Sequence, residues 1–541
     1  MLNYVWIGLL FLGLASALFI DISDITKNTY NNDVPLSVTI KTSSPKAGGG
    51  FDCAVEVSKE NYNKFFSAKI YENVIINGVG SFTDDKKAIQ LYLKTDANTP
   101  EFITRIAKAS GKDDDILARA NILSKQDSTT FLSKVYFEKI SFLSMKRVTN
   151  DSIGIAGTAV QIALGLIGIM AMWLGVMKVA EQAGLIKIIA NWLKPITKKL
   201  FPEVPPDHPA VGSMVMNISA NMLGLGNAAT PFGLKAMEEL DNLNPNKGTA
   251  SNSMITFLAI NTAGMTIIPA TAIAVRAAAG SADPTIIIAT SLFGSTCATI
   301  VGITVAKLFE KFPIEKNGFG SWLKSNLKFF ITVISLISIL VLTFATGLSS
   351  AIGSAFSFLP PTFFKDMIQI ISTIAIPFFI FVFIGYGVIK KVKVYEQFVE
   401  GAKEGFNIAI RIIPYLVAML VAIAIFRAGG AMDNWLIPIL RIVTDPLGMP
   451  AEALPMALMR PLSGSGSLGV MADIIAVHGP DSFIGILVST FFGSSETTFY
   501  VLAVYFGAVN IKNTRHALAA GLAADVAGML GALFIVRLLF G

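Results

Sequence analysis

Glu496 is an acidic residue in a part of the chain where acidic residues are rare. It interrupts an apolar segment and is flanked by Ser494, Ser495, Thr497 and Thr498. A charged side chain inside a membrane costs about 2.5 to 3.5 kcal/mol on insertion scales, so it commonly forms an ion pair, binds a ligand or carries a proton. A hydrogen bond or salt bridge between helices is the structural alternative. We interpret Glu496 and its four hydroxyl-bearing neighbours as candidate substrate-binding residues.

Arg460 is the candidate counter-charge for Glu496. It is followed by an alternation of serine and glycine whose hydroxyls belong to Ser463, Ser465 and Ser467. Residues that form helices poorly can expose backbone N–H groups and hydroxyls to a ligand in a broken helix. Small residues also let helices approach closely, which is the structural interpretation of the same pattern. For Arg460, binding of an anion and a purely structural clamp are both open.

A neutral polar set occupies the corresponding part of the first half of the chain. Its members are Asn217, Ser219, Asn221, Asn227, Thr230, Asn261 and Thr262. Amides and hydroxyls donate and accept hydrogen bonds, which suits an uncharged polar group such as a sugar or the edge of a base. Each residue alone could instead satisfy neighbouring backbone groups. We expect this set to form the other half of the substrate site.

Two further carboxylates lie within or beside apolar segments. Asp473 and Asp525 are, with Glu496, candidates for coupling to a proton or another cation. Either aspartate could instead be interfacial. The remaining charges on amphipathic helices are expected to be solvated, and they include Glu181, Lys403, Glu404 and Arg411.

Common catalytic signatures are absent from the sequence. It contains no zinc-protease helix motif, no nucleophile elbow and no dinucleotide fingerprint between a strand and a helix. The histidines, His208, His478 and His516, have no partner at metal-ligand spacing. We therefore expect no enzymatic activity, no metal site and no cofactor.

The composition indicates the kind of protein that positions these residues. Only 15% of the 541 residues are charged, against about 25% in ordinary soluble chains. Hydrophobic residues make up 53%, the mean hydropathy is +0.62, and apolar stretches of spanning length recur, as in multi-span helical membrane proteins. We attribute the net charge of +6 to membrane orientation and headgroup contacts rather than to nucleic acid.

The first part of the chain contains one apolar run and then a long polar insertion. Residues 1–25 are expected to form a retained transmembrane helix, although Ala15-Ser16-Ala17 leaves signal-peptide cleavage open. Residues 26–148 are expected to form a soluble α+β insertion, large enough at roughly 120 residues to bury a core. The pattern predicts strands at 34–42, 51–57, 74–82 and 88–95, and a helix over 100–123.

The rest of the chain is a series of apolar segments. They lie at residues 153–177, 253–273, 285–306, 329–344, 367–389, 408–426, 483–506 and 517–540, and two more, 211–233 and 454–477, are broken by Gly, Ser, Asn and Pro. Lysine-rich segments face the cytoplasm by the positive-inside rule, and here they are 187–199, 307–328 and 390–393. Loops without Lys or Arg, at 348–364 and 445–452, fit the opposite side. The N-terminus is then inside and residues 26–148 are extracytoplasmic.

The two broken segments suggest an internal repeat. Residues 216–220 followed by 225–227 resemble residues 459–463 followed by 468–470, and the interruptions at 261–266 and 493–498 occur in the same order. The charge rule makes 153–177 and 408–426 run in opposite directions across the membrane. We therefore predict an all-α polytopic membrane protein with inverted repeats and discontinuous helices, which in secondary transporters meet at a midplane site.

Several strings resemble one known family. In the first half GLIGIM (165–170), FPEVPPDHP (201–209), NMLGLGNAATP (221–231) and RAAAG (276–280) are similar to spore maturation protein A. In the second half FVEGAKEGF (398–406), MRPLSGSG (459–466), ETTFYVLAVYFG (496–507) and TRHAL (514–518) are similar to spore maturation protein B. The resemblance covers essentially everything except residues 26–148.

The resemblance implies a fused A–B protein of the nucleoside-recognition (Gate) superfamily, with an A-like repeat at 149–313 and a B-like repeat at 314–541. That superfamily includes the membrane part of ferrous-iron transporter B and relatives of concentrative nucleoside transporters, but this chain has no Gly-x-x-x-x-Gly-Lys-Ser/Thr nucleotide-binding loop. We expect an inner-membrane permease of bacteria that moves a small polar solute, for example a nucleoside-like one, by alternating access. The alternative is a non-transporting envelope maturation, scaffold or sensing protein with a partner-binding outer module.

The expected partners follow from these two hypotheses. They are the lipid bilayer, a small polar solute, a second copy of the chain in a homodimer, and an envelope protein bound by residues 26–148. Nucleic acid is not expected as a partner.

Overall fold

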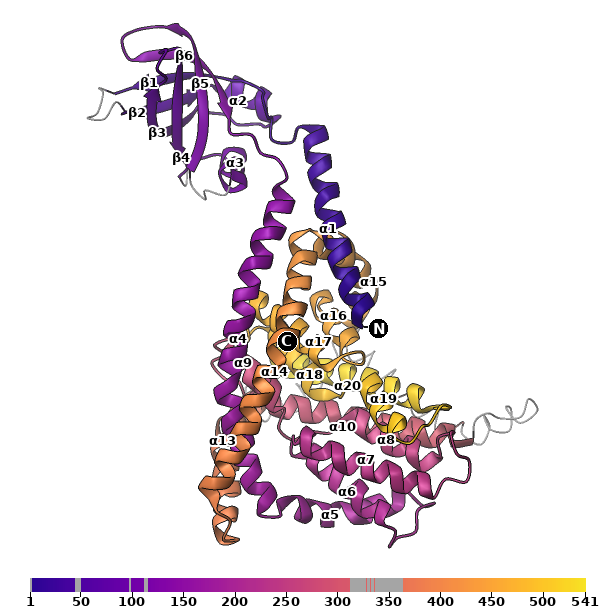
Figure 1. Ribbon diagram of the computed structural model, residues 1–541. Coiled ribbons are helices and arrows are strands. Elements are labelled where there is room, and N and C mark those ends of the chain that lie inside the picture. The colour runs from indigo at the N-terminus through magenta and orange to yellow at the C-terminus, as the bar shows by residue number, and fades with distance from the viewer. Residues whose placement is uncertain are drawn as a thin grey trace, which may run out of the picture. The chain divides into compact units, whose positions relative to one another are not determined.

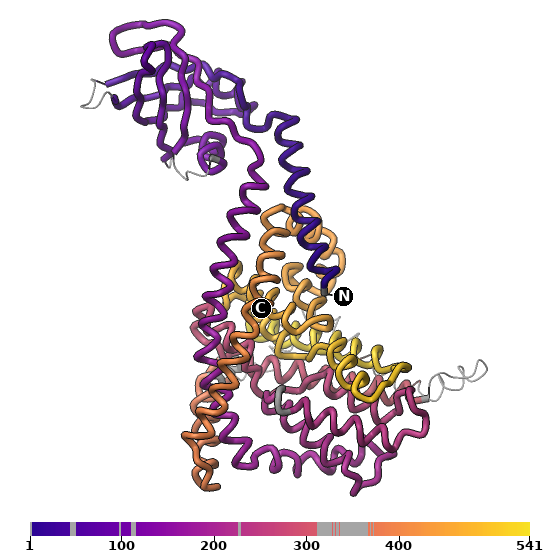
Figure 2. Tube along the Cα trace, in the orientation of Figure 1, coloured from indigo at the N-terminus to yellow at the C-terminus, as the bar shows by residue number. Residues whose placement is uncertain are grey.

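The computed structural model describes residues 2–43, 50–96, 99–110, 115–311 and 363–541, with isolated positions at 327, 331 and 335. The chain divides into two compact units (Figures 1 and 2). One contains Phe11–Asn150 and Ala428–Ala431, and the other contains Met1–Leu10, Asp151–Arg427 and Met432–Gly541. Each unit is described separately below.

The first unit contains a closed β-barrel. Six antiparallel strands pair in chain order, and β1 pairs with β6 to close the barrel. The elements are β1 (Leu36–Thr42), β2 (Gly50–Val57), α2 (Lys59–Phe66), β3 (Val74–Phe82), β4 (Ala88–Lys94), α3 (Glu101–Ser110), β5 (Asp115–Lys125) and β6 (Thr130–Phe137). Closure leaves no strand edge unpaired, so the module does not expose backbone groups for aggregation.

Alternation of apolar and polar residues builds the barrel core. In β4, Ile89, Leu91 and Leu93 are buried while the residues between them are exposed, as the two-residue period of a strand requires. The helix α2 starts at Ser58, whose hydroxyl accepts a hydrogen bond from the N–H of Asn61 at 3.3 Å. This capping satisfies one of the free N–H groups of the first helical turn.

One predicted element of the insertion is wrong in part. The expected helix over residues 100–123 is helical only over Glu101–Ser110, and Asp115–Lys125 forms strand β5. That segment pairs with β4 on one side and β6 on the other, and these pairings outweigh its local helical pattern. The four predicted strands are confirmed as β1 to β4, and β6 was not predicted.

Two long helices flank the barrel in sequence, α1 (Leu2–Lys27) and α4 (Leu143–Gln182). The buried carboxylate of Asp21 in α1 accepts hydrogen bonds from the backbone N–H groups of Ser144 (2.8 Å) and Met145 (2.9 Å). These N–H groups belong to the first turn of α4 and have no partner within that helix. Asp21 therefore caps α4 and holds its start against α1.

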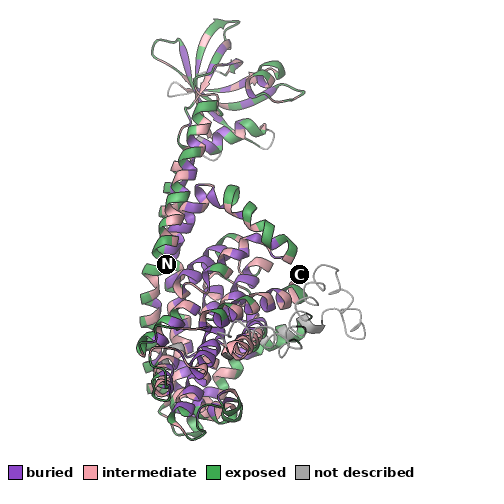
Figure 3. Cartoon of the chain, turned by 90° about the vertical axis from the view of Figure 1, so that its right-hand side faces the viewer, coloured by how far each residue is buried: buried purple, intermediate pink, exposed green. Residues whose placement is uncertain are grey.

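The second unit is helical. Its helices after α4 are α5 (Leu185–Leu200), α6 (Pro209–Met222), α7 (Gly226–Asn242), α8 (Asn252–Ala263), α9 (Ala270–Ala278), α10 (Ile287–Leu308), α13 (Phe363–Ile389), α14 (Val394–Ala428), α15 (Ile437–Leu447), α16 (Leu454–Met459), α17 (Gly464–His478), α18 (Phe483–Ser494), α19 (Thr498–Ala508) and α20 (Ala517–Phe540), with short turns at Phe309–Lys311, Met432–Leu436 and Ala451–Ala453. Buried residues concentrate in the interior of this bundle (Figure 3). The predicted segment 329–344 and loop 348–364 lie almost wholly outside the described residues.

Six helices in the described part of the chain are long and apolar enough to cross a membrane. They are Asn3–Lys27, Leu143–Gln182, Ile287–Leu308, Gln369–Ile389, Val394–Ala428 and Ala517–Phe540. Their length exceeds the roughly 20 residues that a bilayer requires. The chain is therefore a multi-pass membrane protein.

Short non-helical segments interrupt the other helices. They lie at residues 223–225, 264–269, 460–463 and 495–497, so that the predicted apolar segments 253–273 and 483–506 are each two helices. Gly264 ends α8 with φ of 57°, a conformation that costs glycine little. The order of elements from α4 to α10 is repeated from α14 to α20.

The register of this repetition differs from the one read in the sequence. Met216 and Met459 match as sequence, but Met216 lies inside α6 whereas Met459 is the last residue of α16. The helix ends instead place Met222, the last residue of α6, opposite Met459 in the repeated order. Similar residue types therefore occupy different positions relative to the two interruptions.

Candidate functional site

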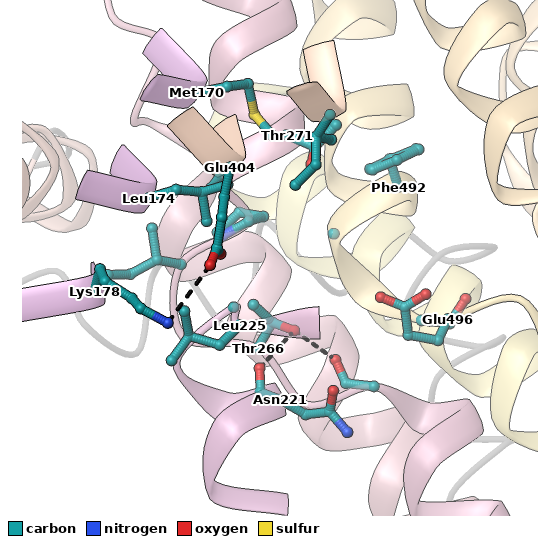
Figure 4. A pocket seen from close by; sticks show the side chains of 18 of the residues that line it. Met170, Leu174, Lys178, Asn221, Leu225, Thr266, Thr271, Glu404, Phe492 and Glu496 are labelled. Atoms are coloured by element: carbon teal, nitrogen blue, oxygen red, sulfur yellow. Dashed lines mark hydrogen bonds and ion pairs between the residues drawn. The ribbon is translucent and has the colours of Figure 1, made fainter. Parts of the chain in front are cut away.

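A cavity of about 560 Å³ opens where the helix interruptions meet helices α4 and α14 (Figure 4). The interruptions contribute Gly224, Leu225, Gly264, Thr266, Ile268 and Pro269 from the first half and Arg460, Ser495 and Glu496 from the second. The helices α4 and α14 contribute the facing wall. The site therefore combines residues that are more than 300 positions apart in the chain.

The interrupted backbone segments bind one another. The N–H of Ile267 donates to the carbonyl of Met222 at 2.8 Å, and the N–H of Phe499 donates to that of Pro461 at 3.1 Å. The N–H of Glu496 donates to the carbonyl of Thr262 at 2.8 Å and so joins the two halves. Non-helical backbone at membrane depth needs partners from protein or water because lipid supplies none. These contacts supply part of that requirement.

Arg460 and Glu496 form an ion pair at the cavity wall. The Arg460 Nη2 and Glu496 Oε2 atoms are 3.6 Å apart, with 7% of the arginine side chain exposed and 50% of the glutamate side chain. Arg460 also donates to the carbonyl of Ser495 and lies over the ring of Phe492 at 4.3 Å. The arginine is thus fixed by three neighbours, while half of the Glu496 side chain is exposed at the cavity.

Charged residues on α4 and α14 form the opposite wall. Lys178 Nζ lies 3.2 Å from Glu181 Oε2 and 3.5 Å from Glu404 Oε1, and Arg411 lines the same cavity. The two helices pack closely because α14 has glycine at the contact. A Cβ atom on Gly405 would lie 2.5 Å from the carbonyl oxygen of Met170, and small residues permit such approach.

The structure places three of the four charges that we expected to be solvated at this cavity, and Glu404 and Arg411 remain exposed there. Glu181, Glu404 and Arg411 line the cavity, whereas Lys403 is exposed and pairs with Glu400 at 3.1 Å. The missed signal is the helical spacing of Glu404 and Arg411, seven residues apart, and of Lys178 and Glu181, three apart. Such spacing places charges on one face of an otherwise apolar helix.

The charges around the cavity balance. Three cationic and three acidic side chains line it, namely Lys178, Arg411, Arg460, Glu181, Glu404 and Glu496. A wall with equal numbers of both signs carries no net charge and so does not favour a polyanion or a polycation. It can hydrogen-bond a neutral polar solute or a zwitterion.

Of the neutral polar residues predicted for the site whose side chains the structure describes, only Asn221 and Ser495 line the cavity. Asn221 Nδ2 donates to Asn261 Oδ1 at 2.9 Å, and that oxygen also accepts from the Tyr505 hydroxyl at 3.3 Å. Asn217 Nδ2 lies 3.2 Å from the same hydroxyl. These buried amides form a network behind the cavity that positions Asn221. Tyr505, which the sequence did not single out, is its centre.

The predicted serines other than Ser495 interact within their own helical segments. Ser463 caps α17 by accepting from the N–H of Gly466 at 3.0 Å, Ser467 donates to the carbonyl of Gly464 at 2.9 Å, and Ser465 lies 3.4 Å from Ser463. These three serines do not belong to the cavity lining. Likewise, Ser219 and Ser494 donate to carbonyls of their own helices, and neither lines the cavity.

Four predicted residues lie near the interruptions without lining the cavity. Thr262 and Thr497 are buried, Thr230 is partly buried in α7, and Thr498 hydrogen-bonds Asp525. The side chain of Asn227 lies outside the described residues. The sequence thus found the interruptions correctly but not which of their side chains face the cavity.

The two candidate ion-coupling aspartates lie in different surroundings. Asp473 pairs with Arg427 at 2.7 Å and lines a second cavity, of about 550 Å³, which is mostly apolar. Asp525 lies in α20 against the interruption 495–497, where its carboxylate accepts from Thr498. Among the described residues no group of three His, Cys, Asp or Glu side chains is placed to hold a metal ion.

Comparisons with known proteins cover both halves of this site. The family described as nucleoside recognition (Gate) matches residues 163–279 and 409–512. The chain is 53% identical to spore maturation protein B of Bacillus subtilis (strain 168) over 176 residues, which are 32% of this chain and 98% of that protein. It is 49% identical to spore maturation protein A of the same organism over 154 residues, 28% of this chain and 79% of that protein. No solved structure matches the chain.

Proposed function

The chain belongs to the family of spore maturation proteins A and B, joined here in one polypeptide, and from this membership we propose that it is a secondary transporter for a small polar solute. It would lie in the bacterial inner membrane with its N-terminus inside and residues 26–148 outside. It would bind and move the solute by alternating access, without a catalytic step.

The observation that carries this proposal is the cavity at the joined helix interruptions. Paired discontinuous helices are the architecture in which transporters hold a substrate at the bilayer midplane. Here Glu496 N–H and Thr262 carbonyl join the interruptions of the two halves, and Glu496 faces the cavity. The repeated order of helices supports two copies of one fold, which we propose to be inverted relative to each other.

The lining supports a neutral or zwitterionic solute, and a nucleoside-like one in particular. Five of the six charges of the wall form ion pairs with one another, and Asn221 offers an amide held by its own network. An amide and a carboxylate can recognise the donors and acceptors of a base or sugar. The match to the nucleoside-recognition family points in the same direction.

Binding by the full-length purified protein tests the proposal. A panel of nucleosides, nucleobases and amino acids is screened by thermal unfolding in detergent, and positive solutes are then tested for uptake into proteoliposomes. A ligand at 100 times its Kd adds about 2.7 kcal/mol to the free energy of unfolding. Glu496→Gln should remove that stabilisation, whereas Lys403→Gln, an exposed charge outside the cavity, should keep it. The proposal fails if nothing in the panel binds or moves and Glu496→Gln has no effect.

A second function is favoured by the barrel. Its outer face exposes large apolar side chains on adjacent strands, with Val79 of β3 opposite Tyr92 of β4 and Ile75 on the same face as Val79. Exposed apolar patches mark interaction surfaces, so an envelope scaffold or sensor would bind its partner here. Replacing residues 30–140 with a Gly-Ser linker keeps α1 and α4. A transporter then retains its solute-dependent stabilisation, and a scaffold loses its partner.

A further inference from the structure

Asp525 lies behind the cavity, on the other side of the interruption that carries Glu496. Its side chain is 8% exposed and its Oδ2 atom accepts a hydrogen bond from the Thr498 hydroxyl. Its Oδ1 atom is buried and has no hydrogen-bond partner. A buried carboxylate oxygen without a partner is costly. Such an atom requires an explanation in terms of a ligand or a missing charge.

A second buried oxygen without a partner lies nearby. The Thr262 side chain is fully buried, and its Oγ1 atom has no hydrogen-bond partner. Thr262 and Thr498 both lie over Gly521, since a Cβ atom there would be 3.3 Å from the methyl of Thr262 and 2.7 Å from that of Thr498. Gly521 precedes Asp525 by one turn of α20, so the two threonines pack on the face of α20 that also carries Asp525.

The electrostatics of this region favour one additional positive charge. Arg460, Glu496 and Asp525 interact electrostatically with one another, so one guanidinium serves two carboxylates. The helices α8 and α18 also end here, at Ala263 and Ser494. The C-terminal end of a helix carries a partial negative charge and free carbonyl groups. An ionised Asp525 therefore leaves one negative charge in this region without a cation.

We propose that Asp525, Thr262 and Thr498 bind a monovalent alkali cation of the size of sodium. A carboxylate, hydroxyls and free carbonyls of helix ends are the oxygen ligands that hard cations take, and such ends coordinate Na⁺ in transporters with broken helices. The inference rests on the proposed transport function, because a cation at this place would couple to a solute held by Glu496. The shared segment 495–498 connects the two sites.

The test measures cation binding in the absence of any solute. Thermal unfolding of the full-length protein in detergent is followed with increasing NaCl, while choline chloride keeps the ionic strength constant at fixed pH. The melting temperature should rise with Na⁺ and saturate. Asp525→Asn should abolish the rise. Thr262→Val, which keeps the side-chain shape and removes one ligand, should raise the half-saturating Na⁺ concentration about tenfold, equivalent to about 1.4 kcal/mol.

A matched control lies on the same helix. Thr256 is also buried with an unpartnered hydroxyl in α8, but it precedes Thr262 by six residues. Thr256→Val should leave the Na⁺ dependence unchanged. The proposal is overturned if the wild-type protein shows no Na⁺-specific stabilisation, or if Asp525→Asn or Thr262→Val leaves that stabilisation intact. It is also overturned if a change of pH alone reproduces the stabilisation, because the site would then bind a proton instead of Na⁺. Na⁺ binding without any solute transport would refute the proposed function and leave the cation site standing.

Discussion

Arg276 shows how the helical unit holds a buried charge. Its side chain is fully buried, and its guanidinium donates to Asp481 Oδ1 (2.9 Å), Ser281 Oγ (3.0 Å) and the carbonyls of Asp283 (3.2 Å) and Pro480. Asp481 lies between α17 and α18 and is 45% exposed. The contact therefore joins the loop after α9 to the loop after α17. Its arginine is shielded from water, whereas its aspartate is accessible to water.

This difference predicts unequal effects of removing either partner. Asp481→Ala leaves the Arg276 charge buried without its acidic partner and should lower the free energy of unfolding by about 3 kcal/mol. Arg276→Met leaves a carboxylate that water can reach and fills the same space with apolar atoms, so it should cost less. Thermal and denaturant unfolding in detergent measure the order. Equal losses, or a larger loss for Arg276→Met, would contradict the interpretation.

The same carboxylate predicts a pH dependence. Partial burial alone would raise the pKa of Asp481, but hydrogen bonds from Ser281 and Ala282 and the charge of Arg276 outweigh burial and lower that pKa. A carboxyl group with a lowered folded-state pKa stabilises the fold above its unfolded pKa, and this contribution is lost as the pH falls through the folded value. Wild-type stability should therefore decrease below about pH 4, and Asp481→Ala should flatten that decrease. An identical acid profile for the two proteins would argue against it.

Cys53 provides a residue-scale probe of the barrel. Burial, with a smaller contribution from Asp52, raises the pKa of the Cys53 thiol to about 11. Because the thiolate is the reactive form, a Cys297→Ser protein should react slowly with an aromatic disulfide reagent at pH 8 and rapidly once denatured. An exposed thiol, Lys69→Cys with Cys53→Ser and Cys297→Ser, is the control for reagent access. Fast reaction of native Cys53 would mean that the barrel opens.

At the scale of elements, the sequence predicted the interruptions better than the surfaces they face. The Gly, Ser and Pro content around residues 224 and 461 signals the breaks, because such residues disfavour helix. The lining depends on which segments meet, and residue type alone does not encode that. Glu496 was recognised because it is isolated among apolar residues. Glu404 was overlooked because a charge on an amphipathic helix has the same local pattern whether it faces water or a cavity.

In the barrel, too, contacts between segments distant in sequence decide a conformation that the local sequence does not. Residues 115–123 have a composition compatible with helix, and their strand conformation comes from hydrogen bonds to β4 and β6. Such pairing is a property of neighbours distant in sequence. The strands β1 to β4 were predictable because their own alternation of apolar and polar residues already specifies one buried face.

The contact between α4 and α14 predicts which glycines are structural. Gly405→Val should destabilise the protein by about 1 to 3 kcal/mol, the usual cost of overpacking, because a Cβ atom at this position would meet the backbone of α4. It should also weaken solute binding, since Glu404 and Lys178 would move apart. Gly168→Ala on α4 has nothing within 4 Å and should be neutral or stabilise by about 0.5 to 1 kcal/mol. Thermal unfolding compares the two, and a harmless Gly405→Val would show that the helices are not in contact.

At the scale of the whole molecule, the chain matches two separate proteins of Bacillus subtilis, covering 98% of spore maturation protein B and 79% of spore maturation protein A. Each half supplies interrupted backbone to the cavity. The hydrogen bond from the N–H of Glu496 to the carbonyl of Thr262 joins these two segments. Because residues of both halves line the cavity, joining the halves in one chain keeps these residues in one molecule. The inversion that we propose has one direct consequence, which is that the two copies cross the membrane in opposite directions.

The N-terminal ends of the apolar parts of α4 and α14 should therefore lie on opposite sides of the membrane. In a background of Cys53→Ser and Cys297→Ser, one cysteine is placed before the apolar part of α4 (Asp151→Cys) and another just before α14 (Lys393→Cys), both at exposed positions. A membrane-impermeant maleimide should label position 151 in spheroplasts, and position 393 only after permeabilisation. Lys198→Cys, in the lysine-rich helix α5, should behave like position 393 by the positive-inside rule. Labelling of 151 and 393 from the same side would mean that the halves run in parallel, and the inverted-repeat transporter would have to be abandoned.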